Sequence, residues 1–326
     1  MRFSEALENG STEYGKPERV VITFVSKLFF FGEKVFKVYK HEDFFFADLL
    51  SFETRKEFYR EDFFYNNTAA PEIYLHLWGI KEVEGSFTFV PPTFGEDFTI
   101  EMSTIDDSQT LTHLLIAERL NSEDPTLLVD ALIDTLTTLT RERRTQLEHL
   151  FSKGLYQIMR EDIESLHTWM YGAQPHISKE QTDSLSALLL EAIEKESYFK
   201  NASIDSLTVA IDNNSDNLLL LNGKPSFIDI MPPMVIWRVA DQYATISRTI
   251  VDCEILGNTK LGSNAHEAYE KRNSQEIPEI ARLVHEIRAA AIQWSYRYAL
   301  KQNDIAEKYG VFAKEKMAEL EVLLKD

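Results

Sequence analysis

Residues 206–231, SLTVAIDNNSDNLLLLNGKPSFIDIM, carry the strongest fold signal in the chain. Two short apolar runs, 218–221 and 226–230, are joined by the sequence Asn-Gly-Lys-Pro at 222–225. Asn-Gly followed by proline is a strong signal for a β-hairpin. Asp229 lies inside the second strand of this hairpin. Because a strand seldom carries a lone carboxylate without a partner, this position needs a chemical reason.

Asp212, Asn217 and Asp229 have a spacing that points to phosphate chemistry. Mg²⁺ prefers oxygen ligands and keeps waters and substrate phosphates, so the amide of Asn217 and the carboxylate of Asp229 are candidate metal ligands. Asp212, at the start of the loop, is a candidate to orient an attacking hydroxyl and accept its proton. This is the Asp-to-Asn spacing of a kinase catalytic loop, followed by an aspartate in the metal-binding position. The alternative is an ordinary hairpin preceded by Asx-type turns.

Upstream, the first hundred residues are rich in strand signals. Segments 19–26, 27–40 and 85–102 combine Val, Ile, Phe and Tyr with alternation and turn residues. Within 27–40 a turn at Gly32 predicts a hairpin, whose second strand places Lys37 on one face and its neighbours Phe36 and Val38 on the other. One amphipathic helix is expected over 49–67. The pattern predicts a small sheet with one helix packed on it.

Beyond Met102 the pattern becomes helical. Leucines at helical spacing over 127–144, and a capping-box pair of Ser178 and Gln181, indicate helices. Ser122 is the expected cap of the first of these, and further helices are expected over 239–256 and 278–313. The sequence therefore predicts an α+β protein with two lobes. Residues 1–101 form a small β-rich lobe that binds nucleotide, and residues 102–326 form a larger helical lobe.

Composition narrows the classes of partner. The chain has 326 residues and a formal net charge of −19. Such a field repels nucleic acid and anionic membrane surfaces and favours a cationic ligand, although the simpler explanation of the charge is a soluble, self-repelling surface. The start of the chain lacks a secretory signal, and no stretch has about 20 apolar residues in a row, so a cytoplasmic bacterial protein is expected. The single cysteine, Cys253, is expected to be a buried structural thiol.

Segment 217–230, NLLLLNGKPSFIDI, resembles the Asn-to-Asp hairpin of the aminoglycoside-phosphotransferase-like family, which has a protein-kinase-like fold. It is most similar to an uncharacterised bacterial branch often fused to a P-loop kinase domain. Segments 22–40, 51–75, 97–115 and 286–300 agree with that branch, so the resemblance spans residues from about 20 to about 300. No G-x-x-x-x-G-K-[ST] motif is present in this sequence.

The resemblance implies roles for further residues. Lys37 matches the strand lysine that holds nucleotide phosphates, and Glu61 is our choice for the helix acid that pairs with it, with Asp62 and Glu57 as competitors. Segment 98–102, ending at Met102, resembles the hinge whose backbone receives adenine. Asp241 matches an aspartate that helps to hold the catalytic loop.

The departures from the family pattern lie around the loop. The family has His-Gly-Asp where this chain has Ala210-Ile211-Asp212, and a second loop histidine is replaced by Asn214. An acid expected before Asp241 is absent, with Trp237 in that region, and the β-rich part lacks a clear glycine-rich phosphate loop. The missing histidine normally braces the loop by packing and hydrogen bonding.

Three functional hypotheses follow. The leading one is a phosphotransferase that uses ATP and Mg²⁺ to phosphorylate a hydroxyl of a small molecule, such as an aminoglycoside or amino alcohol. The runner-up is a pseudokinase that binds nucleotide or metabolite as a sensor or interaction module. The third is a helical interaction protein without a ligand site. The sequence specifies neither the acceptor nor an oligomeric state.

Overall fold

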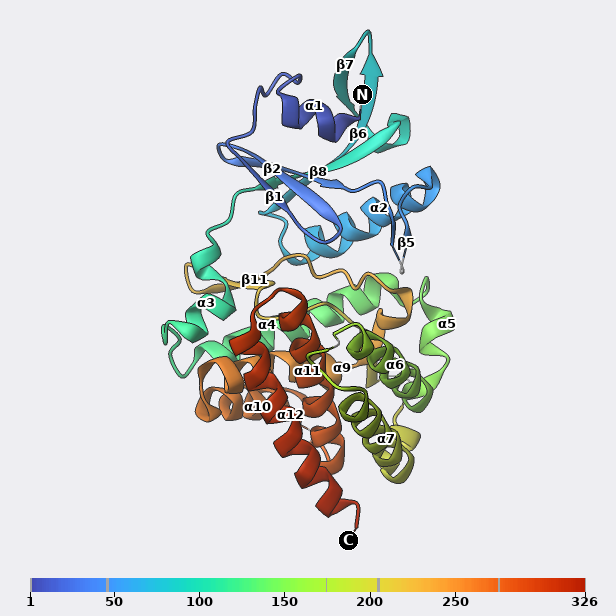
Figure 1. The fold of residues 1–326 in the computed structure, drawn as a ribbon, viewed down its shortest axis with the longest axis vertical. Helices are drawn as coiled ribbons and strands as arrows, with labels where there is room; N and C mark the ends of the chain where they lie inside the picture. Colours follow the sequence, from blue (N-terminus) through green and yellow to red (C-terminus); the bar gives the residue numbers. More distant parts are fainter. Residues whose placement is uncertain (1, 45–46, 174, 204–205, 275, 326) are drawn as a thin grey trace. The chain divides into compact units, whose positions relative to one another are not determined.

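The computed structural model describes residues 2–44, 47–173, 175–203, 206–274 and 276–325. The chain divides into two compact units (Figure 1). Unit 1 contains Met1–Asp107 and Ser226–Met234, and unit 2 contains Ser108–Pro225 and Val235–Asp326. The predicted second strand of the hairpin, 226–230, and the residues just after it therefore belong to the same compact unit as the N-terminal sheet.

Unit 1 is a six-stranded antiparallel sheet with a helix on each face. Its elements in chain order are α1 (Phe3–Asn9), β1 (Arg19–Ile22), β2 (Ser26–Phe31), β3 (Lys34–Tyr39), β4 (Asp43–Phe44), β5 (Ala47–Asp48), α2 (Phe52–Ala69), β6 (Tyr74–Val83), β7 (Ser86–Val90) and β8 (Asp97–Ser103). The strand order in the sheet is β1-β2-β3-β8-β6-β7, and β4 pairs with β5 separately. The boundary predicted between residues 101 and 102 lies inside β8.

The alternation predicted for β3 is confirmed. Phe36 and Val38 belong to a buried cluster with Phe3 and Leu7 of α1, on one face of the sheet. On the opposite face the ring of Tyr39 packs against aromatic rings of α2, whose residues also contact β6 and β8. The sequence did not indicate α1. This helix covers the apolar face that the alternation of β2 and β3 leaves exposed, so Lys37 lies on the α2 side.

Unit 2 is mainly helical. Its elements are α3 (Leu111–Ile116), α4 (Asp124–Arg143), α5 (Glu148–Phe151), α6 (Gly154–Tyr171), α7 (Lys179–Lys195), α8 (Ser197–Asn201), β9 (Leu207–Val209), β10 (Leu218–Leu221), β11 (Lys224–Phe227), β12 (Val239–Asp241), α9 (Gln242–Asp252), α10 (Thr259–Asn273), α11 (Glu279–Ala299) and α12 (Asn303–Leu323). β10 and β11 form the predicted hairpin, with Asn222 and Gly223 both at positive φ in its turn. The second strand is shorter than predicted: β11 ends at Phe227, in the part of the chain assigned to unit 1, and Asp229 lies beyond the strand because its positive φ is incompatible with extended backbone.

Several helix predictions are confirmed and others are wrong at the ends. Ser178 and Gln181 form the predicted capping box at the start of α7. Ser122 does not cap α4: the residue before α4 is Glu123, and the side chain of Asn121 accepts the first amide hydrogens. Segment 239–256 begins as a strand, β12, before α9.

The helix expected over 278–313 is two helices, because Lys301 takes a positive φ between α11 and α12. Figure 1 shows α11 and α12 side by side, and their residues are in contact. Cys253 is buried and free, as predicted. None of the helices in the described ranges has the length and apolar character needed to cross a membrane.

His285 is a titratable group inside the core of unit 2. Its ring is fully buried between Phe199 and Tyr243, and neither ring nitrogen has a hydrogen-bond partner within the described part of the chain. Burial, with a smaller contribution from the positive charge of Arg288, lowers the pKa of His285 to about 3. The native state therefore binds fewer protons here than the unfolded chain, in which a histidine titrates near about 6.5.

We expect this linkage to appear as acid sensitivity. Stability is fully present above about pH 6.5 and falls as the pH drops, by about 1.4 kcal/mol per pH unit for this one group. Urea unfolding of His285→Phe and wild type between pH 7 and 4.5 should show the smaller slope in the variant. Val284→Ala, which removes buried apolar volume beside it, is the control that lowers stability without changing the slope. Equal slopes for His285→Phe and wild type would contradict the assignment.

Candidate active site

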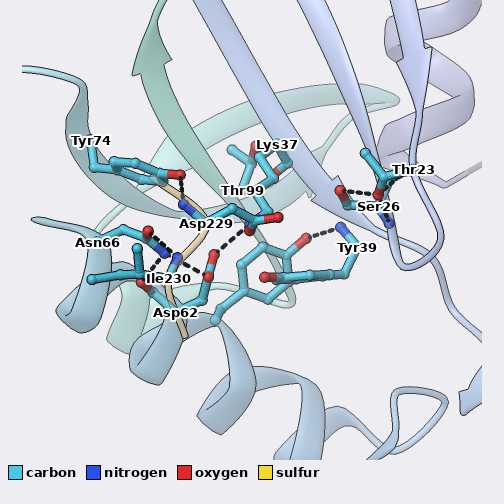
Figure 2. A network of polar contacts seen from close by, with 11 residues as sticks. Thr23, Ser26, Lys37, Tyr39, Asp62, Asn66, Tyr74, Thr99, Asp229 and Ile230 are labelled. Atoms are coloured by element: carbon cyan, nitrogen blue, oxygen red, sulfur yellow. Dashed lines mark hydrogen bonds and ion pairs between the residues drawn. The ribbon is translucent and has the colours of Figure 1, made fainter. Parts of the chain in front are cut away.

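The side chain of Lys37 lies at the centre of a polar network in unit 1 (Figure 2). It extends from β3 on the α2 side of the sheet and is 4% exposed. Its Nζ lies 3.0 Å from Oδ2 of Asp62 and 2.6 Å from Oδ1 of Asp229. Burial by itself lowers the pKa of this lysine, but the two carboxylates outweigh it and raise the pKa well above its usual value. Lys37 is therefore held as a buried cation.

The helix acid that pairs with Lys37 is Asp62, not Glu61. Asp62 lies on the buried face of α2, together with Phe58, Tyr59 and Asn66. Its side chain is 2% exposed. Glu61 lies one position away on the helix and forms no ion pair with Lys37. The choice of Glu61 was wrong because the acid must share the helix face that packs on the sheet.

Asn66 connects Asp62 to the segment after the hairpin. Its amide nitrogen donates to Oδ1 of Asp62 at 2.8 Å, and its amide oxygen accepts the backbone N–H of Ile230 at 3.0 Å. Asn66 is not among the site residues predicted from the sequence. The four-residue spacing from Asp62 to Asn66 was the signal that would have indicated a contact on one helix face.

Asp229 is fixed through its backbone and presents its carboxylate outward. Its N–H donates to the hydroxyl of Tyr74 at 2.9 Å, and it has a φ of 51°. A non-glycine residue in this left-handed region is strained, and such strain is concentrated at functional sites. The side chain is 59% exposed although it pairs with buried Lys37. One carboxylate therefore contacts both the buried cation and solvent.

The β1–β2 turn contains Thr23 and Ser26 rather than glycines. The hydroxyl of Thr23 accepts the N–H of Ser26 at 2.9 Å, as Figure 2 shows. Nζ of Lys40 donates to the carbonyls of Thr23 and Phe24, at 2.7 and 2.8 Å. This turn is held by its own side chains and by Lys40.

Met102 does not lie in a connection that follows the sheet. It is buried in β8 and pairs with Val35 of β3 on one side and Tyr74 of β6 on the other. Its neighbours along 98–101 are likewise in register with flanking strands. The hinge predicted at 98–102 is thus strand, because β8 is an interior strand whose backbone groups serve the sheet ladders.

Unit 2 holds the other predicted residues, Asp212 and Asn217, in one loop. Oδ1 of Asp212 lies 2.7 Å from Nη2 of Arg248 on α9. The amide nitrogen of Asn217 donates to the backbone carbonyl of Asp212 at 2.9 Å, so the two ends of the loop are tied together. No sequence pattern indicated that an arginine of α9 pairs with the candidate base.

Asp241 caps α9. Its carboxylate accepts the N–H groups of Tyr243 and Ala244 and, at 2.7 Å, the hydroxyl of Tyr198. Burial raises the pKa of Asp241, while these three donors act in the opposite direction. The strand residue Asp241 is also paired with Leu207 of β9, the strand that leads into the loop of Asp212.

The donor types of Asn217 and Asp229 fit Mg²⁺, which needs one or two protein oxygens beside waters and phosphates. In the ranges that the structure describes, His, Cys, Asp and Glu side chains form no group of three or more that could hold a metal ion.

Comparison of the fold with solved structures identifies its class. Over 97% of this chain and 98% of the other, it matches an aminoglycoside phosphotransferase solved with GDP and kanamycin, with a TM-score of 0.54 and 10% identity. The wild-type aminoglycoside 2′-phosphotransferase-IIIa with GDP gives 0.53 at 10% identity, covering 97% of this chain and 98% of that one. This chain has the aminoglycoside-phosphotransferase fold.

The same fold is seen in a thermostable mutant of APH(4)-Ia, solved with AMP-PNP and hygromycin B, with a TM-score of 0.51, 14% identity and 98% coverage of both chains. No protein-family model matches the sequence, and no curated protein does. The predicted fold class, a protein-kinase-like α+β fold with a β-rich N-terminal part and a helical C-terminal part, is confirmed. The closer resemblance to one bacterial branch stays a prediction.

The pairing of Lys37 leads to a stability prediction. We expect Asp62→Asn to lower the free energy of unfolding by about 1–3 kcal/mol, because it removes one of two charges that compensate a buried ammonium. Glu61→Gln, the matched change at the neighbouring position, should cost less than about 1 kcal/mol. Urea denaturation at pH 7 measures both. Equal losses would mean that Asp62 has no special role.

Proposed function

We propose that this protein is an ATP-dependent phosphotransferase that phosphorylates a hydroxyl group of a small molecule. The observation that carries this proposal is the Lys37–Asp62–Asp229 network. A buried lysine costs desolvation free energy, and it is stabilised here by one buried acid and one exposed acid. Perturbed titratable groups that combine burial with specific charge partners are concentrated at functional sites.

In this mechanism Lys37 binds the phosphates of the nucleotide, and Asp62 fixes the direction of its ammonium group. Asp229 and Asn217 would hold Mg²⁺, which when bound neutralises charge that develops on the phosphates. Asp212 orients the acceptor hydroxyl. The acceptor oxygen forms a bond to the γ-phosphorus, the bond to the leaving ADP oxygen breaks, and the hydroxyl proton passes to Asp212.

The solved relatives support the class of ligand. Structures with this fold hold a guanine or adenine nucleotide and an aminoglycoside, kanamycin or hygromycin B. A small polyhydroxylated acceptor is therefore the proposed substrate class. The net charge of −19 favours a cationic one.

A second candidate function is favoured by Arg248. Its ion pair with Asp212 neutralises the candidate base, and the histidine that the family pattern has at position 210 is an alanine here. A protein of this kind would bind nucleotide through Lys37 without transferring phosphate.

Nucleotide binding is tested by thermal stability. Mg-ATP should raise the melting temperature of wild type, since binding to the native state adds about 2.7 kcal/mol when the free ligand is at 100 times its Kd. Lys37→Met should abolish this shift. Lys81→Met, an exposed lysine of β6 in the same sheet, should retain it. No shift for wild type at millimolar Mg-ATP would refute both candidate functions.

Turnover separates the enzyme from the binder. Over a panel of aminoglycosides, amino alcohols and sugars, we expect acceptor-dependent ADP formation, with the product confirmed by its added phosphate mass. Asp212→Asn should lower kcat by about 10²–10⁴-fold, the usual contribution of a positioned acid–base group. Its Mg-ATP thermal shift should be unchanged. Equal background rates in wild type and variant would contradict phosphate transfer, and nucleotide binding would be the only one of the two functions left.

A further inference from the structure

The loop between Asp212 and Asn217 is polar yet buried. Asn213, Asn214 and Ser215 are each less than 5% exposed. Buried polar groups cost free energy unless they are hydrogen-bonded, so a loop of this composition needs partners from the surrounding elements. In the family pattern that this sequence resembles, a histidine braces the loop, and its position is Ala210 here, while a second loop histidine is replaced by Asn214.

Helix α9 supplies the first set of partners. The side-chain nitrogen of Asn213 donates to the carbonyl of Thr245 at 2.8 Å and to the hydroxyl of Thr249 at 3.0 Å. Oδ2 of Asp252 accepts the backbone N–H of Ser215 at 2.8 Å. The other oxygen of Asp252 accepts the hydroxyl of Tyr309 on α12 at 2.6 Å, which fixes the orientation of this carboxylate.

Helix α11 supplies a buried arginine. The side chain of Arg297 is 0% exposed, and its Nη1 lies 2.7 Å from Oδ2 of Asp216. Its Nη2 donates to the hydroxyl of Ser215 at 3.4 Å. The second oxygen of Asp216 accepts the hydroxyl of Thr112 on α3 at 2.5 Å. Three helices, α3, α9 and α11, thus contact two consecutive residues of the loop, Ser215 and Asp216, and α12 supports the contact from α9 through Asp252.

The cluster contains one buried arginine and two aspartates. Burial by itself lowers the pKa of Arg297, but Asp216 and Asp252 outweigh it and raise that pKa above its usual value. A buried ion pair contributes little net stability compared with apolar residues of the same volume, whereas loss of one partner is costly. The contribution of the Arg297–Asp216 ion pair is therefore to fix the geometry of the loop rather than to add net stability.

We propose that Arg297 and Asp252 are positioning residues that replace the histidine brace and hold residues 213–216, so that Asp212 and Asn217 keep a fixed separation. The expected effect of these residues on kcat rests on the proposed function. Their structural consequence, an immobilised loop, can be measured without any turnover.

The test compares two arginines of the same helix. Arg288 forms a largely buried ion pair with Asp162 of α6, away from the loop, so Arg288→Gln is matched to Arg297→Gln in the charge that it removes. Both variants should lose stability. Only Arg297→Gln should lower kcat, by about 10–100-fold, with the KM for ATP changed by less than about twofold, because misplacing a catalytic group affects the transition state more than nucleotide binding.

Hydrogen exchange of the loop gives the second readout. The N–H groups of Ser215 and Asn217 are bonded to Asp252 and to the carbonyl of Asn214, and Arg297→Gln should reduce their protection at least about tenfold relative to Arg288→Gln. If wild type transfers no phosphate to any acceptor, the proposed function fails and this comparison still tests the brace. Equal protection in the two variants, or an unchanged kcat for Arg297→Gln, would overturn it.

Tyr309→Phe keeps the test available if Arg297→Gln does not fold. This variant deletes only the hydroxyl that orients Asp252, and it should lower the protection of Ser215 by about threefold or more. Protection equal to that of wild type would count against the role of Asp252.

Discussion

The buried ammonium of Lys37 constrains the organisation of unit 1 more than any apolar contact does. A charge removed from water needs compensation by opposite charge and by hydrogen bonds, and here two carboxylates provide it. These come from α2 and from the end of the hairpin, 25 and 192 positions away along the chain. This requirement explains why Ser226–Met234 belongs to the compact unit of the N-terminal sheet. This segment contains Asp229, whose negative charge compensates the buried ammonium of Lys37.

The surrounding hydrogen bonds fix the orientation of the two acids that pair with Lys37. Asn66 binds Asp62 with its nitrogen and the backbone of Ile230 with its oxygen, while Tyr74 accepts the N–H of Asp229. Each group has one arrangement that satisfies all of its partners, so the carboxylate of Asp229 is fixed although it is exposed. An exposed acid that is fixed in this way is suited to a metal–phosphate ligand.

The elements of the fold could be predicted from local patterns, whereas partners across the chain could not. Alternation in β3 placed Lys37 on the correct face, and Asn-Gly-Lys-Pro identified the hairpin, because both signals arise from neighbouring residues. Asp62 was passed over for Glu61 because adjacent helix positions differ only by the packing face, which tertiary contacts decide. Arg248 and Arg297 gave no signal at all. Their partners lie 36 and 81 residues away, and an arginine in a charged helix resembles a surface residue until its burial is known.

Arg248 bears most directly on whether phosphate is transferred. Nη2 of Arg248 lies 2.7 Å from Oδ1 of Asp212, so this carboxylate is already engaged in an ion pair, which by itself favours a nucleotide binder. In phosphoryl transfer, however, the transition state is loose, and little bond formation to the acceptor has occurred when the leaving oxygen departs. The hydroxyl proton is then still largely in place, so the main contribution of an aspartate is to orient the hydroxyl, which an ion-paired carboxylate still does. For such a reaction the position of Asp212 matters more than its role as a proton acceptor, and the contacts of Arg297 and Asp252 with residues 215 and 216 are the features on which the proposed transfer depends.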